Sequence, residues 1–372
     1  MNGLLLNRSR MMTPQERADW HDYVNEYCTF TILEAGSLYL DYVGTGTAKK
    51  TLQYSINDGE WVSVTAYTGS SRNLIGNLVP GDTVKWSVTS NQSTLQYVKF
   101  ANSSTLKFNL SGNLLSTCFT DFATRKNLGS TTAVFTNLFA DTNIVYADTL
   151  AIPLTAATAS SFTGTFSGCT YMSSAPELPA TKVSGYTYAS MFKGCTSLAD
   201  APNISGVTLA GTNNYQGMFA GCTSLVHAPE LHATALTNCC YQEMFAGCTS
   251  LVYGPDLPVK NAAKTSCYQA MFSGCTSLVE MPEIAATGVT NNSCMEMFKG
   301  CSSLTTVHDL LTIAAKSECY KCMFADCTSL VTPQATLPAT SLAASCYVGM
   351  YSGCTSLTST PTLPAKNVSH CI

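Results

Sequence analysis

Acidic side chains recur at one fixed place in a repeated segment of this chain, and their spacing suggests chemistry. Each follows a repeat cysteine by eight residues, and Asn203 takes the place in one repeat. If the repeats stack as adjacent parallel strands, about 4.8 Å apart, the carboxylates form a ladder. Like charges at that spacing raise one another's pKa or attract a cation. The acidic members are Glu177, Glu230, Asp256, Glu283 and Asp309, and the series stops at Ala335 and Thr362.

Three interpretations of this carboxylate ladder remain open. It can be a solvated edge that keeps the protein soluble. It can bind a ligand or a surface divalent cation. It can also supply the acid pair of a carbohydrate-cleaving site. No other cofactor, no dedicated metal site and no catalytic residue is expected, because no histidine keeps a fixed relation to a cysteine or serine and no glycine-rich phosphate motif is present.

A second column lies five residues after each repeat cysteine and varies in residue type. Variation on a strict frame is what a binding face shows, although drift at unconstrained surface positions gives the same pattern. We therefore name this column as a candidate binding surface together with the ladder. Its members are Asp200, His227, Tyr253, Glu280 and Thr306.

The 18 cysteines follow the repeat phase and do not suggest a disulfide framework. A cysteine that stacks on its own copy in the next repeat behaves as a small buried hydrophobe, so we expect reduced thiols. Cys319-x-x-Cys322 with Cys327 is a possible zinc set, but no matching fourth ligand pair accompanies it. The main column is Cys169, Cys195, Cys222, Cys248, Cys275, Cys301, Cys327 and Cys354.

The repeat that positions these residues reads Met-Phe-x-Gly-Cys-Thr-Ser-Leu and returns every 26 or 27 residues between Phe139 and Tyr351. Such a period is the signature of a solenoid. Tyr241, Met244 and Phe245 have the i, i+3, i+4 spacing of one face of a helical turn, and the proline at 255 ends a short strand. The predicted core includes Met244, Phe245, Cys248, Leu251, Met271, Phe272, Cys275 and Leu278.

The repeat also resembles a known family. Gly-Cys-Thr-Ser-Leu-Val-His-Ala-Pro-Glu-Leu at 221–231 and Cys-Tyr-Gln-Ala-Met-Phe-Ser-Gly-Cys-Thr-Ser-Leu at 267–278 are similar to BspA-like leucine-rich-repeat proteins of anaerobic gut bacteria and their phages. The resemblance covers about residues 138–372. It implies a leucine-rich-repeat solenoid of short parallel strands and helical turns, and a role in surface attachment, but it carries no shared catalytic residues.

The front of the chain differs from the repeats. Residues 1–27 contain a capped amphipathic helix that either packs on its neighbour or anchors the protein in a larger assembly. Residues 28–110 alternate with period two and predict a β-sandwich. Residues 111–137 are expected to cap the first coil of a solenoid at 138–372. The array looks incomplete at Cys371-Ile372, where another turn should begin.

Composition narrows the class of partner. A net charge of -4 without a basic stripe disfavours nucleic acid. No run of 18 apolar residues and no long apolar N-terminal core are present, so neither a membrane span nor ordinary export is expected.

We therefore predict a non-enzymatic phage fibre or decoration protein on the virion surface. It would contact other virion proteins through its N-terminal region and a host glycan or protein through the solenoid, and it could be an oligomer. The alternatives are a bacterial surface adhesin and, more remotely, a glycan-active enzyme.

Overall fold

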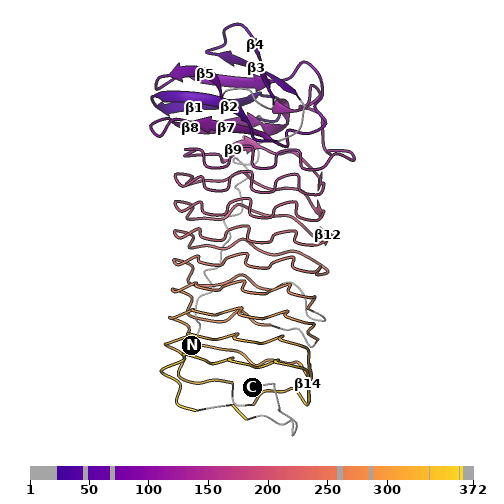
Figure 1. Ribbon diagram of the computed structural model, residues 1–372, viewed down its shortest axis with the longest axis vertical. Helices are drawn as coiled ribbons and strands as arrows, with labels where there is room; N and C mark the ends of the chain where they lie inside the picture. Colours follow the sequence, from indigo (N-terminus) through magenta and orange to yellow (C-terminus); the bar gives the residue numbers. More distant parts are fainter. Residues whose placement is uncertain are drawn as a thin grey trace.

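The computed structural model describes residues 23–44, 49–67, 72–257, 263–284, 288–334, 336–359 and 361–362. Two packed sheets form one end of the molecule, and the rest of the chain forms a stack of layers (Figure 1). The expected N-terminal helix lies outside the described residues apart from 23–27, where Tyr23 is helical and Tyr27 pairs with Asn113, and the incomplete repeat at Cys371-Ile372 lies outside them as well. In the described ranges, no helix has the length and apolar character needed to cross a membrane.

Eight strands with alternating burial build the N-terminal sheets. Asn57 and Asp58 both have positive φ, which is the geometry of a tight hairpin turn between the third and fourth strands. The strands are β1 (Cys28–Glu34), β2 (Gly36–Tyr42), β3 (Lys50–Ile56), β4 (Val62–Ala66), β5 (Asn73–Leu78), β6 (Thr83–Ser87), β7 (Val98–Asn102) and β8 (Lys107–Asn113).

The sheets do not close as an independent sandwich. One has the order β5-β2-β7, and the other has the order β4-β3-β6-β1-β8-β9. In the second sheet β9 (Thr149–Ala151), which belongs to the repeats, pairs in parallel with β8, whereas the other neighbours are antiparallel. The one helix that lies wholly within the described ranges is η1 (Leu114–Thr117), a 3-10 turn capped by the side chain of Asn113. The result is a mixed sheet continuous with the layers.

Each layer is made of consecutive tight turns. Around Tyr215, alternate backbone N–H groups donate to a carbonyl three residues back, as Met218 does to Tyr215 at 3.2 Å. The intervening N–H groups donate to the next layer, as Phe219 does to Met244 at 2.9 Å. Both kinds of bond recur from layer to layer, so the backbone polar groups of this segment are satisfied without a regular helix.

The predicted helical turn in each repeat is wrong. In one layer φ is +55° at Cys239, +56° at Glu243 and +74° at Gly247, a left-handed residue every fourth position. A right-handed helix cannot continue through left-handed residues. Turns of four residues nevertheless bring positions i, i+3 and i+4 to one side, so the Tyr–Met–Phe spacing has the same appearance in sequence as a helix face.

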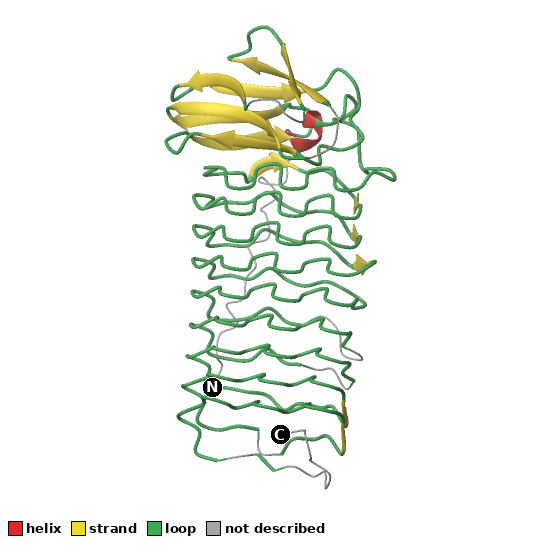
Figure 2. Ribbon diagram, viewed as in Figure 1, coloured by secondary structure: helices red, strands yellow, loops and turns green. Residues whose placement is uncertain are grey.

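The predicted fold class, a β-sandwich followed by a leucine-rich-repeat solenoid of strands and helical turns, is therefore corrected. Regular strands are concentrated in the N-terminal sheets, and those in the layers are two or three residues long (Figure 2). Proline follows the paired residue by two positions, as at Pro202 and Pro255, and cannot donate to a ladder. The short strands are β10 (Ala156–Ala157), β11 (Lys182–Val183), β12 (Thr208–Leu209), β13 (Ala314–Ala315) and β14 (Ser341–Leu342).

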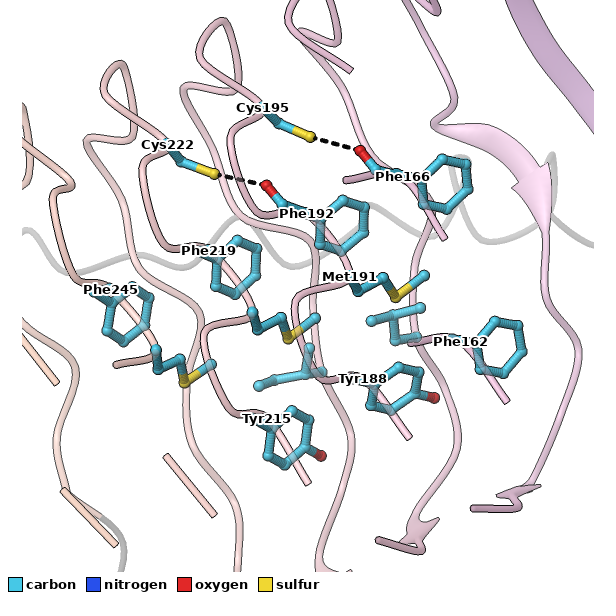
Figure 3. Packing of buried hydrophobic residues seen from close by; sticks show 14 of the residues in the cluster. Phe162, Phe166, Tyr188, Met191, Phe192, Cys195, Tyr215, Phe219, Cys222 and Phe245 are labelled. Carbon is cyan, nitrogen blue, oxygen red and sulfur yellow. Dashed lines mark hydrogen bonds between the residues drawn. The ribbon is translucent and has the colours of Figure 1, made fainter. Parts of the chain in front are cut away.

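Stacked side chains fill the interior of the layers. Phenylalanine rings of successive layers lie nearly parallel, with centroids 5.4 to 5.7 Å apart from Phe139 to Tyr351. A parallel column of tyrosines runs from Tyr188 to Tyr268. Figure 3 shows both columns with a methionine between them. All eight core residues named from the sequence, from Met244 to Leu278, are fully buried.

Candidate functional site

The variable column forms a row on the outside of the layers. Its neighbours pair in parallel where Asp200 meets His227, where Tyr253 meets Glu280 and where Glu280 meets Thr306. The row begins earlier than the sequence motif suggested, because Tyr146 and Ser174 pair in the same way. We call the following residues the exposed row, all of them exposed except the half-buried Ser174, and each 26 to 28 positions from the next: Tyr146, Ser174, Asp200, His227, Tyr253, Glu280 and Thr306.

Imidazole–carboxylate pairs lie along this face. The Nδ1 atom of His227 is 2.7 Å from Oδ1 of Asp200 in the preceding layer. Because a carboxylate only accepts, the imidazole N–H is the donor. The Nε2 atom of His308 is 3.2 Å from Oε1 of Glu280, also across a layer boundary. Both pairs are solvent-exposed, so they add little to stability and leave polar atoms accessible to a ligand.

Two tyrosines of the row present their rings to solvent. Tyr253 is 58% exposed and Tyr146 is 48% exposed. By contrast, the core tyrosines of these layers are buried. Tyr241 in the layer of Tyr253 and Tyr268 in the next layer are each 1% exposed. A tyrosine ring offers a large apolar face with a polar tip, so an exposed tyrosine on a rigid backbone is a natural contact for a ligand.

The carboxylate ladder is less uniform than its spacing suggested. The Oε2 atom of Glu177 accepts a hydrogen bond from the backbone N–H of Asn203 at 3.0 Å, so this carboxylate ties two layers together. Glu230 lies 3.8 Å from His232 in its own layer. Asp256, Glu283 and Asp309 are exposed. Among the residues that the structure describes, no three histidine, cysteine or acidic side chains are grouped so as to hold a metal ion.

The repeat cysteines are structural donors. Every thiol in the main column donates to the carbonyl of a phenylalanine in the preceding layer at 3.0 to 3.1 Å, as Cys222 does to Phe192 (Figure 3). Burial raises the pKa of Cys222 and Cys275 from 9.0 to about 12. These thiols stay protonated at neutral pH, whereas nucleophilic attack and metal binding need the thiolate. No cysteine in the described ranges forms a disulfide, and this includes the zinc candidates Cys319, Cys322 and Cys327.

The pairing of histidines with acids was missed at the sequence level. The signal was present, because His227 follows Asp200 by 27 residues and His308 follows Glu280 by 28. Both intervals place the two residues at neighbouring positions of successive layers. Tyr146 was missed because its layer has Thr142 where later layers have cysteine, whereas Ser174 stands five residues after Cys169 and could have been counted from the motif.

The arrangement can therefore stack a ring on Tyr253 or Tyr146 and exchange hydrogen bonds with the carboxylates and imidazoles beside them. Comparison with known proteins assigns no identity to this arrangement: no protein-family model, no curated protein and no solved structure gives a match to the chain.

Proposed function

We propose that this chain is a non-enzymatic recognition protein that holds a partner on the exposed row. The observation that carries the proposal is the contrast between the interior and the row. Interior positions repeat the same residue from layer to layer, as in the phenylalanine and cysteine columns. The row changes residue from layer to layer, while its backbone pairs in parallel at Tyr146–Ser174, Asp200–His227, Tyr253–Glu280 and Glu280–Thr306. A rigid frame with varied exposed side chains suits binding.

The chemistry of the buried groups supports a structural role for the strict positions. The thiols of the cysteine column donate to backbone carbonyls, and burial keeps their pKa high. The tyrosine column is likewise buried, with the pKa of Tyr215 and Tyr241 raised by desolvation. The charged or imidazole groups available to a ligand on the row belong to Asp200, His227 and Glu280.

We propose a phage virion as the setting, in which the chain acts as a fibre or decoration protein. The support is the resemblance of its Met-Phe-x-Gly-Cys-Thr-Ser-Leu repeat to BspA-like proteins of gut bacteria and their phages. In this setting the N-terminal region contacts other virion proteins and the layers face the host surface.

Mass spectrometry of purified phage particles tests the setting. The particles come from a phage culture in which the chain is encoded, and they are separated from cell debris by their density. We expect peptides of this chain to co-purify with the capsid proteins at a constant ratio across the particle peak. Peptides found only in the cell-envelope fraction would contradict the virion proposal and support a bacterial surface adhesin.

A further inference from the structure

We propose that the ligand of the exposed row is an extended polysaccharide that runs along the stack, with one sugar ring packed on Tyr253. This inference rests on the proposed recognition function and specifies its ligand class. It follows from three features of the row: an exposed ring, hydrogen-bonding groups on both sides of it, and a backbone whose N–H groups near Glu280 and Thr306 bond between layers.

The ring of Tyr253 is placed for stacking. It is the most exposed aromatic side chain in the described ranges, at 58%. Val252 beside it is half-buried, and the N–H of Val279 in the next layer donates to the Val252 carbonyl at 3.2 Å. The ring therefore projects from a backbone that is tied to the following layer through the preceding residue, Val252. The apolar C–H face of a sugar ring matches such a flat apolar surface.

Hydrogen-bonding groups flank the ring along the stack. Glu280 pairs directly with Tyr253 in the parallel register, and His227 occupies the row position one layer before it. Glu280 contacts His308, and His227 contacts Asp200. Each pair offers an acceptor oxygen and an imidazole within a few ångströms of each other. Neighbouring sugar hydroxyls both donate and accept, so they can bind such a pair.

The backbone around the row argues against an added peptide strand. The N–H of Met281 donates to Thr306 at 3.0 Å, and the N–H groups of Thr305 and Thr306 donate to Val279. A peptide that extends a sheet needs unused backbone groups at the sheet edge. The N–H groups of Met281, Thr305 and Thr306 already bond between layers, which favours recognition through side chains at this part of the row.

The length of the row suits a polymer. Tyr146 and Tyr253 stand four layers apart, which is roughly 19 Å at about 4.8 Å per layer. The rise per layer is comparable to the length of one sugar unit in an extended chain. Successive units can therefore meet successive row residues, and the second exposed tyrosine gives a second stacking position. Two linked contacts strengthen binding through effective concentration.

The test uses the full chain, labelled with a fluorophore, and bacterial cells that it binds. Tyr253→Thr removes the ring with little strain, because Thr306 occupies the same row position. Tyr253→Phe keeps the ring. Tyr186→Asn is the matched control, because Tyr186 is 46% exposed but outside the row and Asn213 holds the equivalent left-handed position in the next layer. The soluble probe is polysaccharide extracted from the bound cells.

We expect Tyr253→Thr to weaken binding to the extracted polysaccharide by about tenfold, while Tyr253→Phe and Tyr186→Asn bind within about twofold of the unmodified chain. Periodate oxidation of the cells should abolish binding, and protease treatment should leave it unchanged. Binding that survives periodate but is lost after protease would overturn the glycan inference while leaving recognition intact. Equal binding by Tyr253→Thr would overturn the role of the ring. Failure to bind any cell or polysaccharide would contradict both proposals.

Discussion

The ring of Phe139 in the first layer stacks on the ring of Phe100 in β7, with centroids 5.2 Å apart and planes 13° from parallel. Phe100 in turn packs edge-on against Trp86 and Phe30 in the other sheet. The backbone supports the same contact, because the N–H of Phe100 donates to the Leu138 carbonyl at 2.8 Å. The aromatic column of the layers thus continues into the sheet core, and we expect the two regions to unfold together.

Truncation of this junction should destabilise the whole chain. Phe139→Ala removes a fully buried ring and should lower the free energy of unfolding by about 3–5 kcal/mol. Phe139→Tyr is the control, because Tyr351 occupies the same column. Urea unfolding followed by tryptophan fluorescence reports the N-terminal region, which holds all three tryptophans, and circular dichroism reports the whole chain. Two separated transitions in the unmodified protein would contradict a shared core.

The left-handed glycine of the repeat should tolerate aspartate better than alanine. Gly247 has φ +74°, and Asp326 and Asp141 hold the corresponding left-handed position in other layers at +62° and +60°. An alanine there should cost roughly 1–2 kcal/mol, because Cβ crowds the following carbonyl. Gly247→Asp should cost less, because a short polar side chain tolerates this region. Thermal melts of the two variants rank them, and a more stable Gly247→Ala would contradict the turn geometry.

Alkaline pH should destabilise the folded chain through its buried thiols. Burial raises the pKa of Cys222, Cys240 and Cys275 from 9.0 to about 12. Above pH 9 the unfolded chain loses these protons while the folded chain keeps them, so the free energy of unfolding falls with rising pH. The contribution is fully present below pH 9 and is lost as pH rises toward 12.

Melting temperature measured from pH 7 to 11 checks this sign. Cys222→Ala and Cys275→Ala together should flatten the decline above pH 9, at the cost of lower stability at pH 7. A decline of unchanged slope in the double variant would show that other groups cause the alkaline loss.

Thiol labelling should distinguish the interior from the surface. Cys239, Cys322 and Cys354 are partly exposed, whereas Cys248 and Cys301 are fully buried. In the native state an alkylating reagent should modify the three partly exposed thiols first. The buried thiols should react only after denaturation. Peptide mapping by mass spectrometry after timed labelling gives the order. Early modification of Cys248 would contradict the stacked interior.

The sequence predicted burial better than local conformation. The repeated Phe245 and Cys248 are buried as expected, because a residue that returns at every layer must pack on its own copy. The helical turn was wrong, because four-residue turns and a 3.6-residue helix produce nearly the same spacing of apolar residues. The distinguishing feature is the left-handed backbone at Glu243, and glutamate gives no sequence signal for it.

The candidate site was predictable only in outline. Counting from the cysteine column located Tyr253 and Glu280 at neighbouring row positions. It did not reveal that His308 turns toward Glu280, because that contact depends on side-chain direction across a layer boundary. The ladder of acids was overestimated for a similar reason: Glu177 uses its carboxylate on the backbone of Asn203.

The most direct test of whether the exposed row recognises a partner compares binding to host cells by the unmodified full chain and by a variant. In this variant, which we call the flattened row, the row side chains are replaced by threonine. Asp200, His227, Tyr253 and Glu280 are changed together to threonine, the residue that the chain itself places at 306. A control carries four exposed substitutions outside the row. Both variants must first show the melting behaviour of the unmodified protein. We predict that the flattened row loses cell binding while the control retains it. Equal binding by the flattened variant would contradict recognition through this row.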